Sequence, residues 1–150
     1  MSTTTGSITF FHSYKQKQLD GTIVLDTHTL KVAFCTSVQA LTAAGQSVYA
    51  DLTNELTTAN GYTAGGQTLA GVALTTAAGV AKFDATDPVL TATGGNLTAF
   101  YWVLYDDTAA TKPLICFGLL DTTAGGTAVT ITDGNPITYI IPAGGFFTLT

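Results

Sequence analysis

The stretch Leu97-Thr-Ala-Phe-Tyr-Trp-Val-Leu-Tyr105 decides the fold class of this chain. Successive side chains of an extended strand point to opposite faces of a sheet. Phe100, Trp102 and Leu104 therefore share one face, and the residues that alternate with them (two tyrosines, a valine and an alanine) share the other. Because both faces are apolar, this stretch predicts a central strand of a sheet that is covered on both sides.

The rest of the chain shows the same kind of pattern in shorter segments. These segments predict strands at 29–36, 62–69, 71–76, 80–84, 97–105, 114–120, 127–132, 137–141 and 146–149. Turn residues separate them, and Ala77-Ala-Gly79 is typical of a hairpin connection. We therefore predict an all-β, single-domain jelly roll or β-sandwich over residues 10–150, with about eight to nine short antiparallel strands.

The beginning of the chain has a different pattern. Phe11–Leu19 predicts a short amphipathic helix that ends at Asp20-Gly21, and a second helical turn is expected around residues 50–55. Residues 1–9 are predicted to form an extended N-terminal arm. A Thr-, Gly- and Ser-rich arm needs a partner to be ordered, so we expect it to lie against another chain; the alternative is an arm folded back on its own domain.

The composition is unusually poor in charge. Only 10% of the residues are charged and 46% are hydrophobic, whereas about 25% charged residues are typical. A soluble monomer would be expected to carry more surface charge. A surface covered by copies of the chain or by a scaffold explains this composition, and a secreted bacterial β-protein is the alternative.

The charge and hydropathy patterns also bear on partners and location. The net charge is −5, and the five lysines are scattered with no arginine, which argues against nucleic-acid binding. The apolar runs are far shorter than the ~20 residues of a membrane-spanning helix. The N-terminus lacks the pattern of a signal peptide. We expect a protein made in a host cytoplasm, with no membrane partner.

Few residues are candidates for catalysis or metal binding. His12 lies on the expected helix and His28 in Asp26-Thr-His-Thr29; a general base is conceivable, but an exposed turn residue is the favoured interpretation. Asp106-Asp107 and Asp84-Ala-Thr-Asp87 could ligate Ca²⁺. Each follows a strand, where aspartate is favoured for turn hydrogen bonds, so the turn interpretation is preferred.

Three further features favour a structural interpretation. Cys35 and Cys116 lie in apolar strands and are expected to be buried free thiols, with a disulfide as the alternative. Gly61-Tyr-Thr-Ala-Gly-Gly66 matches no phosphate-binding loop and predicts a turn. The aromatic residues of 100–105 are expected in the core rather than on a sugar-binding platform. We predict no catalytic, cofactor-binding or metal-binding residue, and no enzyme activity.

Five segments occur in an order that resembles a known family. They are Leu25-Asp-Thr-His-Thr-Leu-Lys-Val-Ala-Phe34, Gly61-Tyr-Thr-Ala-Gly-Gly-Gln-Thr-Leu-Ala70, Ala81-Lys-Phe-Asp-Ala85, Thr98–Asp107 and Pro113–Leu120. Together they resemble small virion structural proteins of tailed phages, of the head decoration or cement kind, and the GYTAGG segment is the most distinctive part. The chain departs from that family near Pro88-Val89, where a Trp is frequent, and at Phe100, where an Arg is frequent. The resemblance implies a jelly-roll or sandwich domain on the virion and carries no catalytic residues over.

The expected function is that of a capsid decoration (cement) protein. It would bind the outer capsid surface, bridge major capsid protein subunits, and associate with copies of itself as a dimer or trimer. A tail, baseplate or fibre-adaptor structural protein is the first alternative. A receptor- or glycan-binding module is the second, and it would need aromatic side chains exposed on loops.

Overall fold

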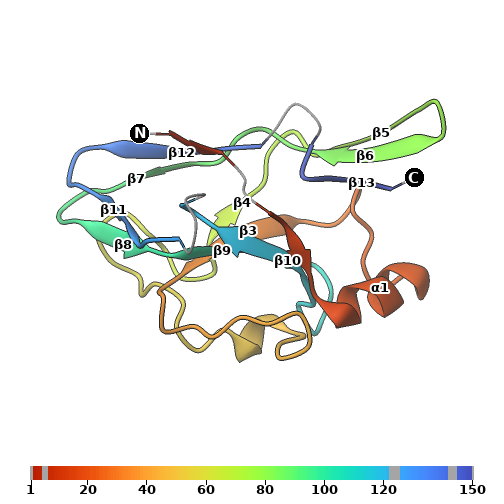
Figure 1. The fold of residues 1–150 in the computed structure, drawn as a ribbon, viewed down its shortest axis with the longest axis horizontal. Helices are drawn as coiled ribbons and strands as arrows, with labels where there is room; N and C mark the ends of the chain where they lie inside the picture. The colour runs from red at the N-terminus through yellow and green to blue at the C-terminus, as the bar shows by residue number, and fades with distance from the viewer. Residues whose placement is uncertain (1, 5–6, 122–125, 142–144, 150) are drawn as a thin grey trace.

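The computed structural model describes residues 2–4, 7–121, 126–141 and 145–149, and five of its strands form one central sheet. In spatial order these are β2 (Thr9–Phe10), β10 (Leu114–Leu119), β9 (Tyr101–Asp106), β3 (Leu30–Cys35) and β4 (Gln67–Thr68). All neighbours in this sheet are antiparallel, and β9 lies in the middle (Figure 1). The prediction of a central strand within 97–105 is confirmed.

The two faces of the central sheet carry separate apolar clusters. On β9, Trp102 and Leu104 belong to the cluster on one face, and Val103 and Tyr105 to the cluster on the other; all four are fully buried. β3 alternates in the same way, with Val32 and Phe34 opposite Ala33 and Cys35. The sheet is therefore covered on both sides, as its sequence pattern predicts.

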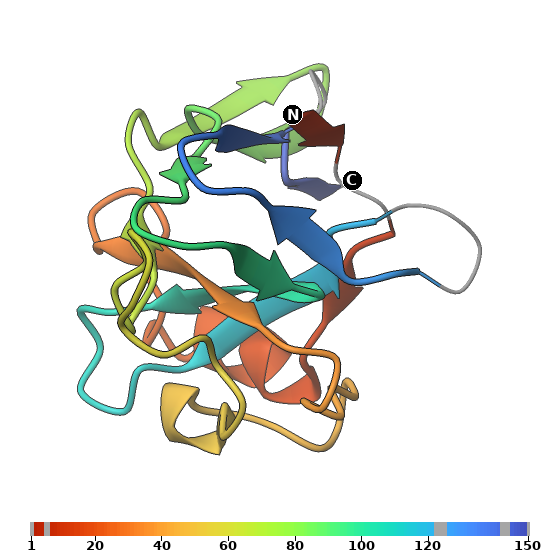
Figure 2. The same cartoon turned by 90° about the vertical axis from the view of Figure 1, so that its left-hand side faces the viewer.

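Small sheets cover one face of the central sheet, as the two perpendicular views show (Figures 1 and 2). One has the order β1-β12-β7 and the other β13-β6-β5, and β8 pairs with β11 beside them. Trp102 of the central sheet contacts Tyr139 and Phe146 of this layer, with ring centroids 5.1 and 5.8 Å apart. The bounds are β1 (Ser2–Thr4), β5 (Ala73–Ala77), β6 (Val80–Asp84), β7 (Val89–Thr91), β8 (Leu97–Ala99), β11 (Val129–Ile131), β12 (Pro136–Ile140) and β13 (Phe147–Leu149).

The opposite face is covered by a loop rather than by strands. Residues 36–56 pass under the sheet and include the 3₁₀ turn η1 (Tyr49–Asp51), and Leu41, Tyr49 and Leu52 pack against its apolar cluster. The helix α1 (His12–Leu19) lies beside β10 (Figure 1). The helix ends at Leu19 with Asp20 as its C-cap, and Gly21 follows with φ +76°, so the predicted helix and its glycine cap are confirmed. Its predicted amphipathic character is wrong, because Tyr14 is the only buried residue of the helix and Leu19 is exposed.

The described residues form thirteen short strands, more than the eight or nine predicted. The expected strand 97–105 is divided at Phe100 into β8 and β9, and 62–69 contains only β4 after a series of turns. β10 has a bulge between Leu114 and Cys116. A bulge breaks the alternation of faces, so Ile115 and Phe117 lie in opposite clusters although their spacing predicts one face. The coarser prediction stands: the chain is mostly β, with several antiparallel sheets and one short helix in its described part.

The N-terminal arm lies on its own chain where it is described. The sequence predicts an arm against a partner, but Ser2–Thr4 pairs in parallel with Thr138–Ile140 of β12, and Thr9–Phe10 pairs with β10. The unpaired edge of β12 supplies the hydrogen-bonding groups that the arm needs. This is the folded-back alternative.

Candidate functional site

The GYTAGG segment, Gly61–Gly66, is fastened to the edge of the central sheet through Tyr62. This side chain is buried, and its hydroxyl donates to Glu55 Oε1 at 2.6 Å. The same hydroxyl accepts a hydrogen bond from the backbone N–H of Phe34 at 3.1 Å. Tyr62 therefore ties the segment both to β3 and to the loop that carries Glu55.

Glu55, the only glutamate in the chain, is the centre of this arrangement. Its carboxylate accepts from the hydroxyls of Tyr62 and Tyr49 and from the backbone N–H of Gly65 at 2.7 Å. Tyr105 of β9 donates to the carbonyl of Gly65 at 2.6 Å and stacks on Tyr49 with ring centroids 4.7 Å apart. We name Glu55, Tyr49, Tyr62, Tyr105 and Gly65 the Glu55 cluster.

The electrostatics of the Glu55 cluster favour a fastening role over a reactive one. Burial raises the pKa of all three phenols, and the hydrogen bonds to Glu55 raise it further for Tyr49 and Tyr62. The phenols therefore stay protonated and act as donors at neutral pH. This cluster was not predicted from the sequence. The one signal in the sequence was that Glu55 is the single glutamate of the chain.

Two glycines of the segment are required by close backbone approach. A Cβ on Gly66 would lie 2.1 Å from the carbonyl oxygen of Val32, and one on Gly61 would lie 2.3 Å from that of Thr91. Both glycines also have positive φ, +76° and +88°. The segment is a series of turns packed against strands, so the turn interpretation is confirmed.

His28 and the aspartate pair after β9 come together in the structure. His28 Nδ1 lies 2.5 Å from Asp106 Oδ2, and the Asp106 side chain is fully buried. The other oxygen of Asp106 accepts from the backbone N–H groups of Thr108 and Ala109. Asp106 therefore organises a turn, as aspartate is favoured to do, and it orients His28 at the same time.

Asp107 is held by two lysines rather than directed at an open site. Lys112 Nζ lies 2.7 Å from one carboxylate oxygen and Lys31 Nζ 2.8 Å from the other. The hydrogen bond from Lys112, then that from Lys31, lowers the pKa of Asp107. His12 is exposed on α1 and belongs to neither group.

The second aspartate pair is also engaged within the protein. Asp84 pairs with Lys82 at 2.8 Å, and Asp87 accepts from the backbone N–H of Ile141 at 2.8 Å. In the described part of the chain, no three His, Cys, Asp or Glu side chains gather in a way that could hold a metal ion.

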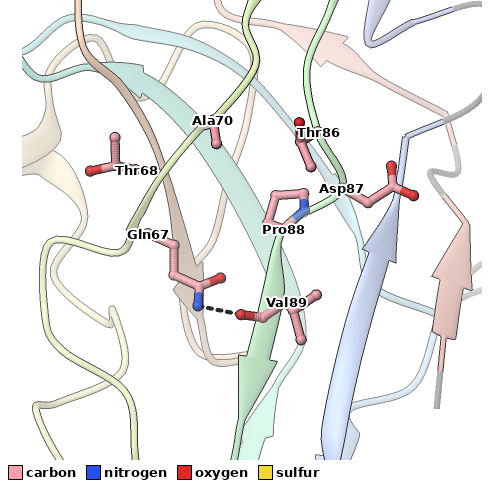
Figure 3. A pocket seen from close by; sticks show the side chains of 7 residues that line it. All are labelled: Gln67, Thr68, Ala70, Thr86, Asp87, Pro88 and Val89. Carbon is pink, nitrogen blue, oxygen red and sulfur yellow. Dashed lines mark hydrogen bonds between the residues drawn. The ribbon is translucent and has the colours of Figure 1, made fainter.

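A pocket of about 190 Å³ lies between β4 and β7, the facing edges of two sheets (Figure 3). The Gln67 amide crosses it and donates to the carbonyl of Val89 at 2.6 Å. Asp87, the only carboxylate in its lining, points away from Gln67 (Figure 3). Beside Asp87 the lining holds no second acid or base. Its lining is Gln67, Thr68, Ala70, Thr86, Asp87, Pro88 and Val89.

The cysteines are buried, and so are Trp102 and Tyr105 of the aromatic stretch 100–105, whereas Phe100 and Tyr101 are only partly buried. Cys35 and Cys116 are buried free thiols, as predicted, and they lie in opposite clusters of the central sheet. Burial raises the pKa of Cys35 to about 12 and that of Cys116 further. No aromatic side chain is exposed, and all fifteen lie in the described part of the chain. Among the described residues, the exposed large apolar side chains are Leu19, Val38, Leu74, Val89 and Leu149.

The described surface offers sheet edges and polar strand faces. None of the described helices has the length and apolar character to cross a membrane. Comparison with known protein families, with curated proteins and with solved structures finds no match to this chain.

Proposed function

We propose that this chain is a capsid decoration protein of a tailed phage. In this role it binds the outside of the shell and bridges neighbouring major capsid protein subunits. The observation that carries the proposal is the ordered series of five segments that resembles small phage virion proteins. The jelly-roll or β-sandwich assignment belongs to the same proposal.

The positions of those segments support it. Four of the five supply β3, β4, β9 and β10, which are neighbours in the central sheet. The distinctive Gly61–Gly66 segment fastens this sheet through the Glu55 cluster. The segments that carry the resemblance therefore lie together and form the structural framework of the central sheet. A scaffold-building motif is what a structural protein would share with its relatives, whereas enzymes share reactive groups.

The surface is the second support. The scarcity of charge suits a protein whose outer faces are covered in an assembly. With every aromatic side chain at least partly buried, the glycan-binding alternative lacks the exposed ring on which a sugar stacks. A subunit that touches two or more shell proteins gains avidity from simultaneous engagement.

Co-sedimentation with mature shells of a phage that lacks this gene tests the proposal. We expect saturable binding at hundreds of copies per shell and a more heat-resistant particle. Because the subunit carries few charges, binding should weaken little between low and moderate salt, unlike electrostatic adsorption. Absence of shell binding, with recovery in tail preparations instead, would refute the proposal and support the tail alternative.

A further inference from the structure

The strand β5 forms an open edge at the margin of the molecule. It is the outer strand of the sheet β13-β6-β5, and no described residue pairs with its free side. Four of its five residues, Leu74–Ala77, are exposed, and the β5–β6 hairpin extends beyond the body of the molecule (Figure 1). It is the longest of the described edge strands.

β5 lacks the features with which proteins usually protect an edge. Natural edge strands carry charges, prolines or bulges that prevent pairing with other chains. Ala73-Leu-Thr-Thr-Ala77 has no charge and no proline, and its register with β6 is continuous. The edge of β7 differs, because the Gln67 side chain caps the carbonyl of Val89 there.

The hairpin geometry shows which backbone groups point outward. The turn residues Ala78 and Gly79 both have positive φ, as in the two-residue turn that follows a hydrogen-bonded closing pair. Ala77 and Val80 form that closing pair, and from there hydrogen-bonded and non-hydrogen-bonded pairs alternate along the two strands. Leu74 and Thr76 belong to non-hydrogen-bonded pairs. The N–H and C=O groups of Leu74 and Thr76 therefore point away from β6.

We propose that a second copy of this chain pairs antiparallel with β5 about a two-fold axis at Thr75. In this register Leu74 of each copy faces Thr76 of the other, so about four backbone hydrogen bonds form. The seam brings no like charges together although each copy carries a net charge of −5, because β5 is neutral and Lys82 and Asp84 on the adjacent strand pair with each other. Two-fold pairing uses both free edges and so ends at a dimer.

The exposed apolar residue of β5 agrees with that arrangement. The cross-strand register places Leu74 on the same face as Phe83 and Phe147. Leu74 is 46% exposed. A second copy would extend this face and cover Leu74. The pairing does not depend on binding to a shell.

Disulfide trapping with Thr75→Cys tests the axis directly. The Cα atoms of a non-hydrogen-bonded antiparallel pair are about 4.5 Å apart, which is within the range of a disulfide. The native thiols are buried, so the new cysteine is the accessible one. With copper(II) phenanthroline as oxidant, Thr75→Cys should form a covalent dimer at least about ten-fold faster than Thr57→Cys, which places the thiol on an exposed loop. Equal rates would overturn the proposal.

Sedimentation analysis of the purified chain, without shells, gives an independent measurement. We expect Thr76→Lys to weaken dimerisation about ten-fold or more, because lysine protects edges, while the matched Thr57→Lys has little effect. Circular dichroism checks that both variants fold. A wild-type chain that stays monomeric up to about 1 mM, or equal dimerisation of the two lysine variants, would overturn the proposal. Either result leaves the shell-binding experiment to be decided separately.

Discussion

Replacing Gly66 by alanine should be one of the most destabilising small changes in this protein. The new Cβ would lie 2.1 Å from Val32 O and 2.8 Å from Ala33 Cα, and both are backbone atoms of β3. Overpacking of this kind costs about 1–3 kcal/mol, and the left-handed conformation at φ +76° adds about 1–2 kcal/mol for alanine. We therefore expect a loss of about 2–5 kcal/mol from a total stability of about 5–15 kcal/mol.

Gly79→Ala is the matched control for this prediction. Gly79 has nearly the same backbone conformation, φ +82°, but no atom lies within 4 Å of the Cβ position. Only the conformational part of the cost should remain, about 1–2 kcal/mol. The difference between the two variants isolates the steric contact with β3.

Urea unfolding measures both variants through the fluorescence of Trp102, the only tryptophan, which is fully buried. Gly66→Ala should lower the unfolding midpoint more than Gly79→Ala does, with an unchanged m-value. Equal losses would refute the reasoning, because they would mean that the strand yields to the added methyl group without cost.

Three further predictions concern the charged groups and the thiols. Glu55→Gln should lower stability by about 1–3 kcal/mol, since an amide cannot accept from all three donors; a thermal melt no different from that of the exposed control Asp26→Asn would contradict this. Lys112 and Lys31 lower the pKa of Asp107 in the folded protein. The stabilisation that Asp107 provides is therefore present above its unfolded pKa of 3.8, and it is lost as the pH falls through the folded pKa. The free energies of unfolding of wild type and Asp107→Asn, measured with urea, should therefore converge in acid and differ by about 0.2–1 kcal/mol near neutrality. Cys35 and Cys116 should react with Ellman's reagent only after denaturation, and rapid reaction of the folded protein would show that they are accessible.

The central strand and its two apolar faces were predictable because a short stretch that is apolar on both faces of a strand must be covered on both sides. The β5–β6 hairpin was predictable too, since Ala78-Gly79 provides the positive φ values that a tight turn needs. These features depend on residues that are close in the sequence. Local pattern is sufficient for them.

Irregularities within the strands could not be predicted in the same way. Phe100 lies where the chain passes from β8, which pairs with β11, to β9 of the central sheet. Its N–H donates to the carbonyl of Cys35, and its carbonyl accepts from the N–H of Leu120. The bulge in β10 depends on the register with β9. Both result from pairing between distant segments, which a single sequence does not specify.

The Glu55 cluster could not be predicted from the sequence either, because it also depends on contacts between distant segments. Its members come from four parts of the chain, and only Tyr62 and Gly65 lie in one recognisable motif. A resemblance can mark the motif, but the structure supplies the reason for it. Gly61 and Gly66 lack the Cβ atoms that would collide with backbone atoms of Thr91 and Val32. The buried hydroxyl of Tyr62 accepts a hydrogen bond from the backbone N–H of Phe34.

The threonine-rich surface connects this fold to assembly through the cost of removing water. Thr98 and Thr130 lie opposite each other on β8 and β11, and their hydroxyls hydrogen-bond at 3.0 Å, so they satisfy each other without charge. Burying a hydroxyl costs about 1–3 kcal/mol when it is unpaired, whereas burying an ion costs several kcal/mol. Paired hydroxyls lower that cost further. A surface made of threonines instead of lysines and glutamates can therefore stay hydrated in the free chain and still lose its water readily when another protein covers it, which is the property that the proposed shell-binding role needs.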